Sequence, residues 1–363
     1  MNATQTLHDL GQSLWLDNIT RALLDNGTLA RYIDEFSITG LTSNPTIFEH
    51  AIGNAGTYDD AIRGKTREGK SGEALFFELA LEDLRRAADL FRPVFDATGG
   101  VDGWVSLEVS PLLAHDAAAT IAAAAQLHAR AERPNLLIKI PGTSEGLAAI
   151  EASIFAGVPV NVTLLFSRAQ YQAAAQAYLR GIERRIAGDL DPRVGSVASL
   201  FVSRWDVAAG KTLPASLNNQ LGIAVAQQAY RAYRELLASP RWRSVAAAGA
   251  RAQRLLWAST GTKDPAASDT LYVEQLAAPD TVNTIPEKTL LAFADHGQLR
   301  QPPPIETNDG DAVIAACRQA GISVDALAAQ LQREGADAFS TSWRALLENI
   351  AAKARKLTEE GAR

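Results

Sequence analysis

Eight short apolar segments, separated by stretches of helix length, constrain the fold more than any other feature of this sequence of 363 residues. Several of them, such as 136–140 and 160–166, are apolar on both faces, which is typical of strands buried on two sides. Eight alternations of strand and helix favour a closed parallel (β/α)8 TIM barrel, with an open doubly wound sheet as the main alternative. The expected strands are 13–17, 36–44, 104–110, 135–141, 159–166, 196–203, 254–261 and 281–286.

Helix-forming segments rich in Ala, Leu, Glu and Arg lie between these strands, for example at 73–91 and 168–187. Beyond residue 286 the pattern changes, because 301–304 is a proline-rich break. Three more helices are expected after it, at 309–319, 324–334 (with Ser323 as its N-cap) and 337–356. We therefore expect one barrel domain over residues 1–363, with its core at about 10–300 and a helical extension at about 305–358 that packs on the barrel or forms an oligomer contact.

Charge and cysteine content narrow the class of protein. The formal net charge of −6 argues against a broad basic surface for nucleic acid, although a local cationic pocket for phosphate remains possible. The one cysteine, Cys317, cannot form an intrachain disulfide, which fits a reducing compartment. Residues 1–16 lack the features of a signal peptide, and no apolar stretch has the length of a membrane span. We expect a cytoplasmic protein without nucleic-acid or membrane partners.

Lys139 is the residue of greatest chemical interest, because it lies in a strand-like apolar run with no neighbouring charge. Alternation along a strand places it on one face with Leu137 and Pro141. A lysine inside a buried strand must lose its charge, find a partner or reach a polar cavity. Desolvation favours the neutral amine, which attacks carbonyl carbons. The alternative is a lysine at a strand end that extends to water.

Polar residues also occur on the faces or ends of other expected strands: Asp17, Asn44, Glu108, Asn161, Thr163 and Ser199. Asp17 and Asn44 each follow a strand and could be helix caps instead. In a parallel barrel the carboxyl ends of all strands meet at one mouth, where active sites form. A barrel would therefore bring these side chains together with Lys139.

Three residues near the sixth and seventh strands indicate an anionic ligand. Arg204 follows the sixth strand, and Ser259 and Lys263 flank a glycine-containing turn after the seventh. Such a loop can hold a phosphate, and barrels often bind phosphate near strands seven and eight. The alternative is an ordinary turn with a solvated lysine.

Motifs for nucleotide and metal chemistry are missing from the sequence. Gly210-Lys211-Thr212 looks like the end of a nucleotide-binding loop, but Trp205 stands where that motif needs glycine. The five histidines show no His-Glu-x-x-His spacing and no cluster with the cysteine. We expect no cofactor and no metal.

Four motifs in order resemble the transaldolase family, over about residues 13–297. They are Leu41-Thr-Ser-Asn-Pro45, the Schiff-base strand Asn135-Leu-Leu-Ile-Lys-Ile-Pro141, Asn161-Val-Thr-Leu-Leu-Phe-Ser167 and Ser199-Leu-Phe-Val-Ser-Arg204. The resemblance implies a cofactor-free enzyme, a monomer or homodimer, that moves a dihydroxyacetone unit between sugar phosphates of the non-oxidative pentose phosphate pathway. The donor would be sedoheptulose 7-phosphate or fructose 6-phosphate, and the acceptor glyceraldehyde 3-phosphate or erythrose 4-phosphate.

The resemblance also implies a role for each candidate residue. Lys139 would form the imine, and Asp17 would exchange the proton of the sugar's C4 hydroxyl. Glu108 would act with a water molecule and Thr163 in imine formation. The hydroxyls of dihydroxyacetone would be held by Asn44, Asn161 and Ser199, with Thr42 in support. The terminal phosphate would be bound by Arg204 and Ser259.

Two positions bear on the choice between a transaldolase and a related aldolase, and on which residue supplies a positive charge for the phosphate. The related fructose-6-phosphate aldolases, which release free dihydroxyacetone, typically have Tyr where this chain has Phe201 and lack the counterpart of Glu108. Many members of the family have Arg at the position of Gly261, and we expect Lys263 to replace that charge. A sugar-phosphate-binding protein without activity is a third possibility, against which the presence of two acids beside Lys139 argues.

Overall fold

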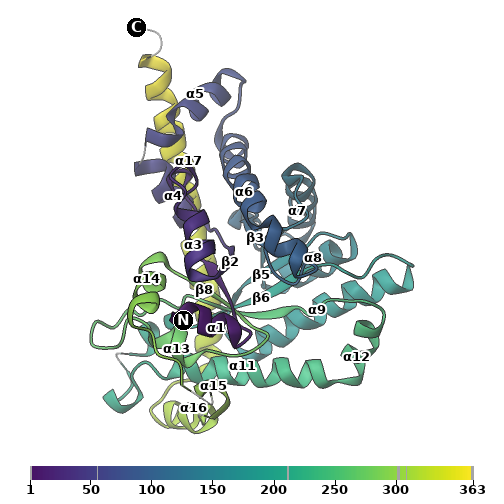
Figure 1. Ribbon diagram of the computed structural model, residues 1–363, viewed down its shortest axis with the longest axis vertical. Coiled ribbons are helices and arrows are strands. Elements are labelled where there is room, and N and C mark those ends of the chain that lie inside the picture. The colour runs from purple at the N-terminus through teal and green to yellow at the C-terminus, as the bar shows by residue number, and fades with distance from the viewer. Residues whose placement is uncertain (1, 55, 211, 301–302, 308, 361–363) are drawn as a thin grey trace.

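The structure is a computed structural model, and it describes residues 2–54, 56–210, 212–300, 303–307 and 309–360. Its strands form a closed parallel barrel in chain order, in which the last strand pairs with the first. Figure 1 shows the strands in the interior of the molecule with helices around them. The expected (β/α)8 barrel is confirmed, and the open sheet is excluded. The strands are β1 Ser13–Leu16, β2 Ile38–Leu41, β3 Val105–Glu108, β4 Leu136–Pro141, β5 Val160–Leu165, β6 Ser196–Phe201, β7 Arg254–Ala258 and β8 Val282–Ile285.

Helices cover the barrel, and each strand is followed by at least one of them. The first half of the chain contributes α1 Ala3–Asp9, α2 Arg21–Asp25, α3 Thr28–Phe36, α4 Pro45–Asn54, α5 Asp59–Arg67, α6 Gly72–Ala97, α7 Ala117–Ala131, α8 Ser144–Phe155 and α9 Arg168–Ala187. The second half contributes α10 Ser203–Ala209, α11 Leu221–Ala238, α12 Pro240–Ala247, α13 Leu271–Gln275, α14 Glu287–His296, α15 Pro304–Thr307, α16 Gly310–Gln319 and α17 Val324–Glu360.

Several strands are shorter than the sequence predicts. The expected second strand begins at residue 36, but Phe36 is the last residue of α3, and Ser37 takes a left-handed conformation with a φ of 54° before β2 starts. Asp17 and Asn44 lie just beyond the ends of β1 and β2 rather than within them. Residues that leave the hydrogen-bonded ladder at the carboxyl ends are the ones free to face the mouth.

Alternation along β4 separates two apolar cores. Leu136, Ile138 and Ile140 belong to the cluster between the barrel and its helices. Leu137 faces inward and packs in a second cluster with Trp15 and other side chains of the barrel interior. The interior is therefore filled by side chains, as in other barrels of this kind, and Lys139 shares the inward face with Leu137.

The chain after the barrel differs from the prediction in one respect. The two helices expected at 324–334 and 337–356 form one continuous helix, α17 Val324–Glu360. The helix passes through Gly335 without a break. A Cβ atom at this position would lie 2.9 Å from Leu164 Cδ2 and 3.3 Å from Arg204 Nη1, so the glycine allows the helix to pack closely against the barrel mouth. Residues 301–302 of the expected proline-rich break lie outside the described residues.

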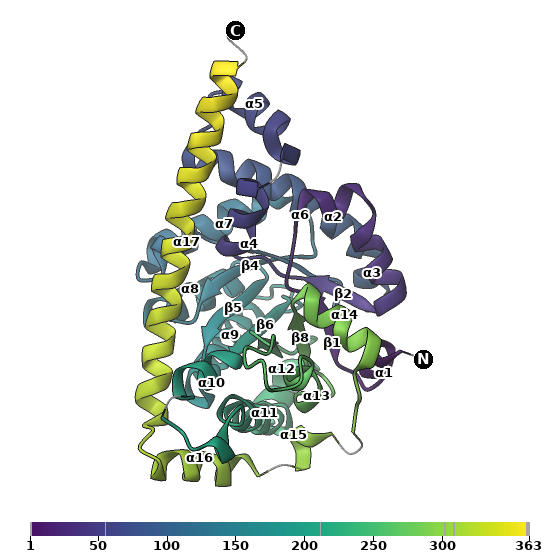
Figure 2. The same cartoon turned by 90° about the vertical axis from the view of Figure 1, so that its left-hand side faces the viewer.

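The long helix α17 extends along one side of the molecule, and α16 lies across its lower end (Figure 2). The buried side chains of α17 include Leu331, Phe339 and Trp343. Among the described residues, no single helix is both long and apolar enough to cross a membrane, and only the bent pair of α16 and α17 reaches that threshold, by length and composition alone.

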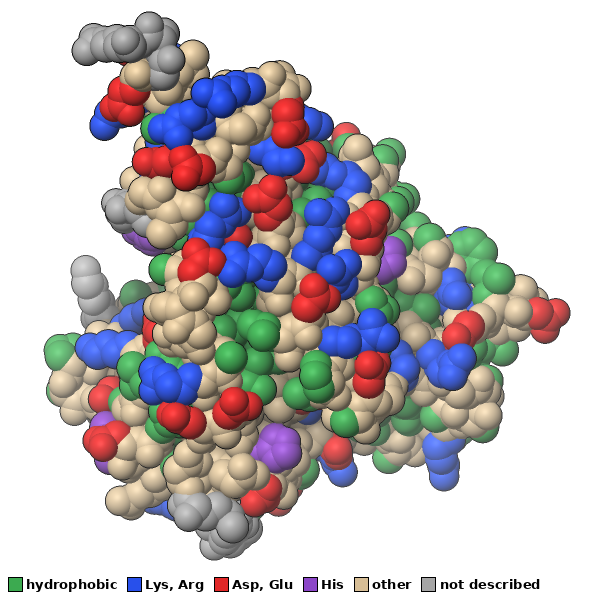
Figure 3. Space-filling view, turned by 45° about the horizontal axis from the view of Figure 1, so that its top comes forward, with side chains coloured by type: hydrophobic (Ala, Val, Ile, Leu, Met, Phe, Trp, Pro, Cys, Tyr) green, Lys and Arg blue, Asp and Glu red, His purple; other side chains and the backbone are tan. Residues whose placement is uncertain are grey.

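Charges of both signs are interleaved on the surface. Figure 3 shows Lys and Arg side chains next to Asp and Glu side chains over the upper part of one face. Ion pairs also link helices at the surface, for example Arg231 of α11 with Asp311 of α16 at 2.7 Å. Exposed pairs of this kind contribute little to stability individually, so the cores described above hold the fold together.

Candidate active site

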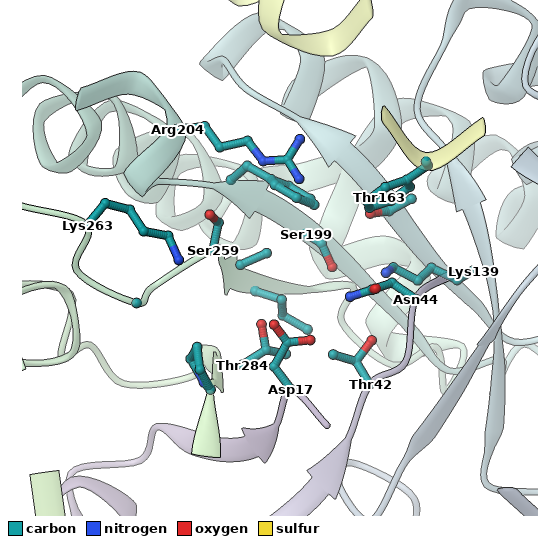
Figure 4. A pocket seen from close by; sticks show the side chains of 16 residues that line it. Asp17, Thr42, Asn44, Lys139, Thr163, Ser199, Arg204, Ser259, Lys263 and Thr284 are labelled. Carbon is teal, nitrogen blue, oxygen red and sulfur yellow. The ribbon is translucent and has the colours of Figure 1, made fainter. Parts of the chain in front are cut away.

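A cavity opens at the carboxyl ends of the barrel strands (Figure 4). Its wall contains ten of the twelve residues that the sequence singles out: Asp17, Thr42, Asn44, Lys139, Thr163, Ser199, Phe201, Arg204, Ser259 and Lys263. In Figure 4 Lys139 lies at one side of the cavity with Asn44, while Arg204 and Lys263 lie at the other. Glu108 and Asn161 are not part of the wall, but each contacts a residue that is.

The register of three neighbouring strands places Lys139 between two polar partners. Lys139 of β4 lies opposite Glu108 of β3 and Asn161 of β5, so all three side chains have the same orientation relative to the barrel. Its Nζ lies 3.1 Å from Glu108 Oε2 and donates a hydrogen bond to the carbonyl oxygen of Ser43 at 3.2 Å. Of the three options for a buried strand lysine, this one has a carboxylate partner and also reaches a polar cavity.

Burial changes the acidity of Glu108. Its side chain is 3% exposed, and desolvation raises its pKa, while the nearby charge of Lys139 opposes the rise. A carboxylate with a raised pKa is a better acceptor for a proton from the ammonium group. The pair can therefore supply the neutral amine that attack on a carbonyl requires.

A chain of hydrogen bonds links Ser199 of the cavity wall to Asn161 and Ser106, which lie outside the wall. The Ser199 hydroxyl donates to Asn161 Oδ1 at 2.7 Å, and Asn161 Nδ2 donates to the hydroxyl of Ser106 at 3.1 Å. These contacts fix the orientation of the Asn161 amide. The Ser199 oxygen thereby keeps its acceptor side available to the cavity.

Asp17 lies across the cavity on the loop after β1. Within the described residues its carboxylate accepts no hydrogen bond, so it is not a helix cap. Desolvation raises its pKa, and the positive charges of Lys139, Lys263 and Arg204 oppose the rise. An unpaired carboxyl group facing a cavity is suited to exchange protons with a bound molecule.

Asn44 does serve as a cap, whereas two threonine hydroxyls nearby have no hydrogen-bond partner in the described part of the chain. The Asn44 side-chain oxygen accepts a hydrogen bond from the N–H of Ile47 at 3.0 Å, which caps α4 and leaves the amide nitrogen for the cavity. The hydroxyls of Thr42 and Thr163 are buried and form no hydrogen bond with described residues. Buried hydroxyls without partners cost free energy, and a ligand or water can satisfy them.

Three polar groups gather at the far side of the cavity. Arg204 lies at the start of α10, and burial lowers its pKa from the usual arginine value. Ser259 has a φ of 57°, in the left-handed region, and its hydroxyl lies 2.8 Å from that of Ser203. Backbone strain of this kind is found at ligand-binding turns.

Lys263 reaches the space in front of Gly261. A Cβ atom added to Gly261 would lie 3.8 Å from Lys263 Nζ and 3.2 Å from Pro286 Cγ. The amine of Lys263 therefore occupies the region where a longer side chain at position 261 would begin. Neither Lys263 nor Arg204 forms an ion pair with a described residue.

Sequence reasoning missed several residues of the wall, among them Thr284, Pro286 and Phe339. The first two could have been found, since alternation along the eighth strand puts them on one face. Phe339 belongs to α17, where an inward aromatic residue cannot be distinguished by sequence from ordinary core. Among the described residues no group of three or more His, Cys, Asp or Glu side chains is arranged to hold a metal ion.

Residues 14–350 match the family described as Transaldolase/Fructose-6-phosphate aldolase. The chain belongs to this family. It is 45% identical over 353 residues to the transaldolase of Saccharopolyspora erythraea, which covers 95% of this chain and 96% of the relative. It is also 45% identical over 358 residues to the transaldolase of Thiobacillus denitrificans, covering 96% and 100% of the two chains. The family resemblance of the motifs is confirmed, and the chain is an enzyme of the transaldolase type.

Proposed function

We propose that the enzyme transfers a dihydroxyacetone unit from a ketose phosphate to an aldose phosphate through an imine on Lys139. The observation that supports this most directly is a buried amine, 3.1 Å from the carboxylate of Glu108, in a cavity whose far side contains Arg204 and Lys263. The amine can bond to a ketone carbon while the cations bind a phosphate at the other end of the sugar.

The imine forms in two steps. Neutral Lys139 attacks C2 of the ketose to give a carbinolamine, after Glu108 has taken the proton of the ammonium group. Glu108 then returns a proton to the leaving hydroxyl through a water molecule held by Thr163, whose hydroxyl has no hydrogen-bond partner among the described residues. Loss of water leaves a protonated imine, which draws electrons from the C3–C4 bond.

Asp17 completes the cleavage. Its carboxylate takes the proton of the C4 hydroxyl, the C3–C4 bond breaks, and the aldose phosphate leaves. The electron pair of the broken bond stays with the dihydroxyacetone unit as an enamine. Hydrogen bonds with Asn44, Asn161 and Ser199 would hold its hydroxyls. A second aldose phosphate adds to the enamine, Asp17 returns the proton, and hydrolysis of the new imine frees the product ketose.

Arg204, Ser259 and Lys263 would bind the phosphate group. The amine of Lys263 lies close to Gly261, the position at which many family members have Arg. This supports the proposal that Lys263 supplies the charge of that arginine. Sedoheptulose 7-phosphate and fructose 6-phosphate are the proposed donors, with glyceraldehyde 3-phosphate and erythrose 4-phosphate as acceptors, in the non-oxidative pentose phosphate pathway of the cytoplasm. The combination of Phe201 and Glu108 favours transfer over an aldolase reaction that releases dihydroxyacetone.

Borohydride trapping tests the proposal. Incubation with fructose 6-phosphate and borohydride should reduce the imine and leave a stable adduct on the peptide that contains Lys139, located by mass spectrometry. Lys139→Ala should lack both adduct and turnover. Lys139→Arg is the matched control, since it keeps a cation opposite Glu108 but forms no imine. Residual turnover above about 1% in either variant would rule out an obligatory covalent step. Product release without acceptor aldehyde would indicate the aldolase instead.

A further inference from the structure

One side chain of the cavity wall comes from the C-terminal helix. The other residues of the wall belong to the barrel strands or to the segments that directly follow them, whereas Phe339 lies in the middle of α17. Its side chain is only 5% exposed and packs in the cluster that includes Phe201 and Leu164. The helix thus closes one side of the cavity with an aromatic ring.

The ring of Phe339 lies close to two cations. Arg204 Cζ is 5.8 Å from its centroid, and Lys139 Nζ is 5.6 Å from it. Arg204 Cζ also lies 5.0 Å from the centroid of Phe201, so two rings from different parts of the chain contact the same guanidinium group. Cations and aromatic faces attract each other, most strongly when water is excluded.

The two cations depend on the ring to different degrees. Lys139 has an ion pair with Glu108 and a hydrogen bond to Ser43 that hold its position. Arg204 forms no hydrogen bond or ion pair with any residue that the structure describes. Aromatic contacts are therefore the directional interactions that orient Arg204, and loss of the Phe339 ring should affect Arg204 more than Lys139.

The position of the ring is fixed by the docking of α17 on the barrel. Gln332 donates hydrogen bonds to the carbonyl oxygens of Gly142 at 3.0 Å and Leu164 at 2.9 Å, at the ends of β4 and β5. One turn later, a Cβ atom on Gly335 would come within 2.9 Å of Leu164 Cδ2 and 3.3 Å of Arg204 Nη1. Phe339 follows four residues further on, on the same face of the helix.

We infer that Phe339 is a specificity-determining residue: together with Phe201 it holds the Arg204 guanidinium in place to receive the substrate phosphate, so that the enzyme selects phosphorylated over unphosphorylated ketoses. The inference rests on the proposed function, because it takes Arg204 as the phosphate ligand. The C-terminal helix thereby sets substrate preference as well as covering the barrel.

The experiment compares fructose 6-phosphate with fructose as donors, by the concentration at half-maximal borohydride trapping on Lys139. In Phe339→Leu, which keeps most of the volume but has no ring, half-saturation with fructose 6-phosphate should rise roughly tenfold, whereas that with fructose should change less than about twofold. The maximal extent of trapping should be unchanged for both sugars. Equal changes for the two donors, or none, would overturn the inference.

Two further variants separate this role from simple destabilisation. Phe339→Tyr restores the aromatic face and should return the ratio of the two half-saturation concentrations to within about twofold of wild type. Leu346→Ala, at a buried position on the same helix away from the cavity, should lower the melting temperature and leave that ratio unchanged. A ratio altered as strongly by Leu346→Ala would contradict a specific role for the ring.

The same trapping experiment would give a different result if the proposed function were wrong. If the wild-type enzyme forms no adduct on Lys139 with either sugar, the covalent mechanism itself is wrong. If the adduct forms normally and only the response to Phe339→Leu is absent, the mechanism stands and the inference about Phe339 is wrong.

Discussion

The two ends of the barrel both contain charged side chains, but they differ in how many of these have partners within the protein. At the amino end, Asp102 accepts hydrogen bonds from the Ser13 hydroxyl, from Trp15 Nε1 at 2.8 Å and from the N–H of Gly103 at 2.9 Å. Arg254 donates to Ser13 and to the carbonyl oxygen of Thr281, each at 2.7 Å. Arg254 Nη1 also lies 3.8 Å from Asp102 Oδ2, so the two opposite charges pair within the protein itself.

At the carboxyl end, several charged groups lack such partners. Asp17, Arg204 and Lys263 face the cavity and form no hydrogen bond or ion pair with the described residues. Asp17 and Arg204 are half-buried, whereas Lys263 is exposed. Charges partly removed from water without partners are costly, so an arrangement of this kind persists where a ligand completes it. The comparison teaches that a buried charge with partners need not mark function, whereas charged groups without protein partners around a cavity do.

The largest effect is expected from Asp17→Asn. The variant keeps the shape of the side chain but cannot accept the C4 proton, so kcat should fall about a thousandfold. Unfolding by urea should show a stability equal to or above that of wild type, because an unpaired carboxylate has been removed. Imine trapping should fall much less than turnover. If Asp17→Asn lowered the free energy of unfolding as well as kcat, Asp17 would behave like the charges at the amino end. The contrast between the two ends of the barrel would then be wrong.

Asp102→Ala should have the opposite effects, a loss of stability with little change in kcat. Removal of one partner leaves Arg254 buried without its carboxylate, and the free energy of unfolding should fall by about 3–5 kcal/mol. The kcat per folded molecule, measured well below the melting temperature, should remain near the wild-type value. A large drop in kcat in the folded variant would show that the amino end takes part in catalysis.

Lys263→Ala should have a smaller effect, confined to phosphate binding. We expect KM for fructose 6-phosphate to rise about tenfold with little change in kcat. Adding Gly261→Arg to this variant supplies a cation from the neighbouring position and should recover part of the loss. The new side chain requires Pro286 to shift slightly, since Cβ would lie 3.2 Å from its ring. An unchanged KM in Lys263→Ala would identify Lys263 as a plain surface residue.

Asp206 lies between these two cases, because it has hydrogen-bond partners and yet a raised pKa. Its replacement should have the smallest effect. Its carboxylate accepts hydrogen bonds from the Tyr272 hydroxyl at 2.8 Å and from two backbone N–H groups, yet burial raises its pKa to about 6. The folded state therefore holds this proton more tightly than the unfolded state does. The stabilisation is full below the unfolded pKa of about 4 and is lost as the pH rises through 6.

Urea unfolding of wild type and Asp206→Asn measures this contribution. Between pH 5 and pH 8 the stability of wild type relative to the variant should fall by about 1–1.5 kcal/mol. A difference independent of pH would mean that Asp206 is ionised throughout this range and that its three donors compensate burial fully, as at the amino end.

The sequence predicts the barrel and much of its mouth because both depend on local patterns. Alternation along 136–140 distinguishes the inward face of Lys139 from the outward face, and parallel strands bring their ends together whatever the loops do. The same pattern cannot decide between cap and catalytic group: Asn44 caps α4 and Asp17 caps nothing, because the outcome depends on where the next helix starts.

Contacts between distant segments could not be predicted in this way. The sequence predicts two helices that end and begin on either side of Gly335, whereas α17 is continuous there, and the glycine lets the helix lie close to Leu164. Phe339 looks like one apolar residue among many on an amphipathic helix. Its place beside Arg204 follows from the docking of α17, which involves residues more than a hundred positions apart.

The course of α17 also bears on when the enzyme becomes competent during synthesis. Elements of a domain emerge from the ribosome in chain order, and β8 precedes the helix that supplies Phe339. The segments that carry Lys139 and Glu108 therefore leave the ribosome before the helix that forms the wall beside Arg204. If Phe339 positions Arg204 as proposed, the discrimination for phosphate depends on the last synthesised of the described helices.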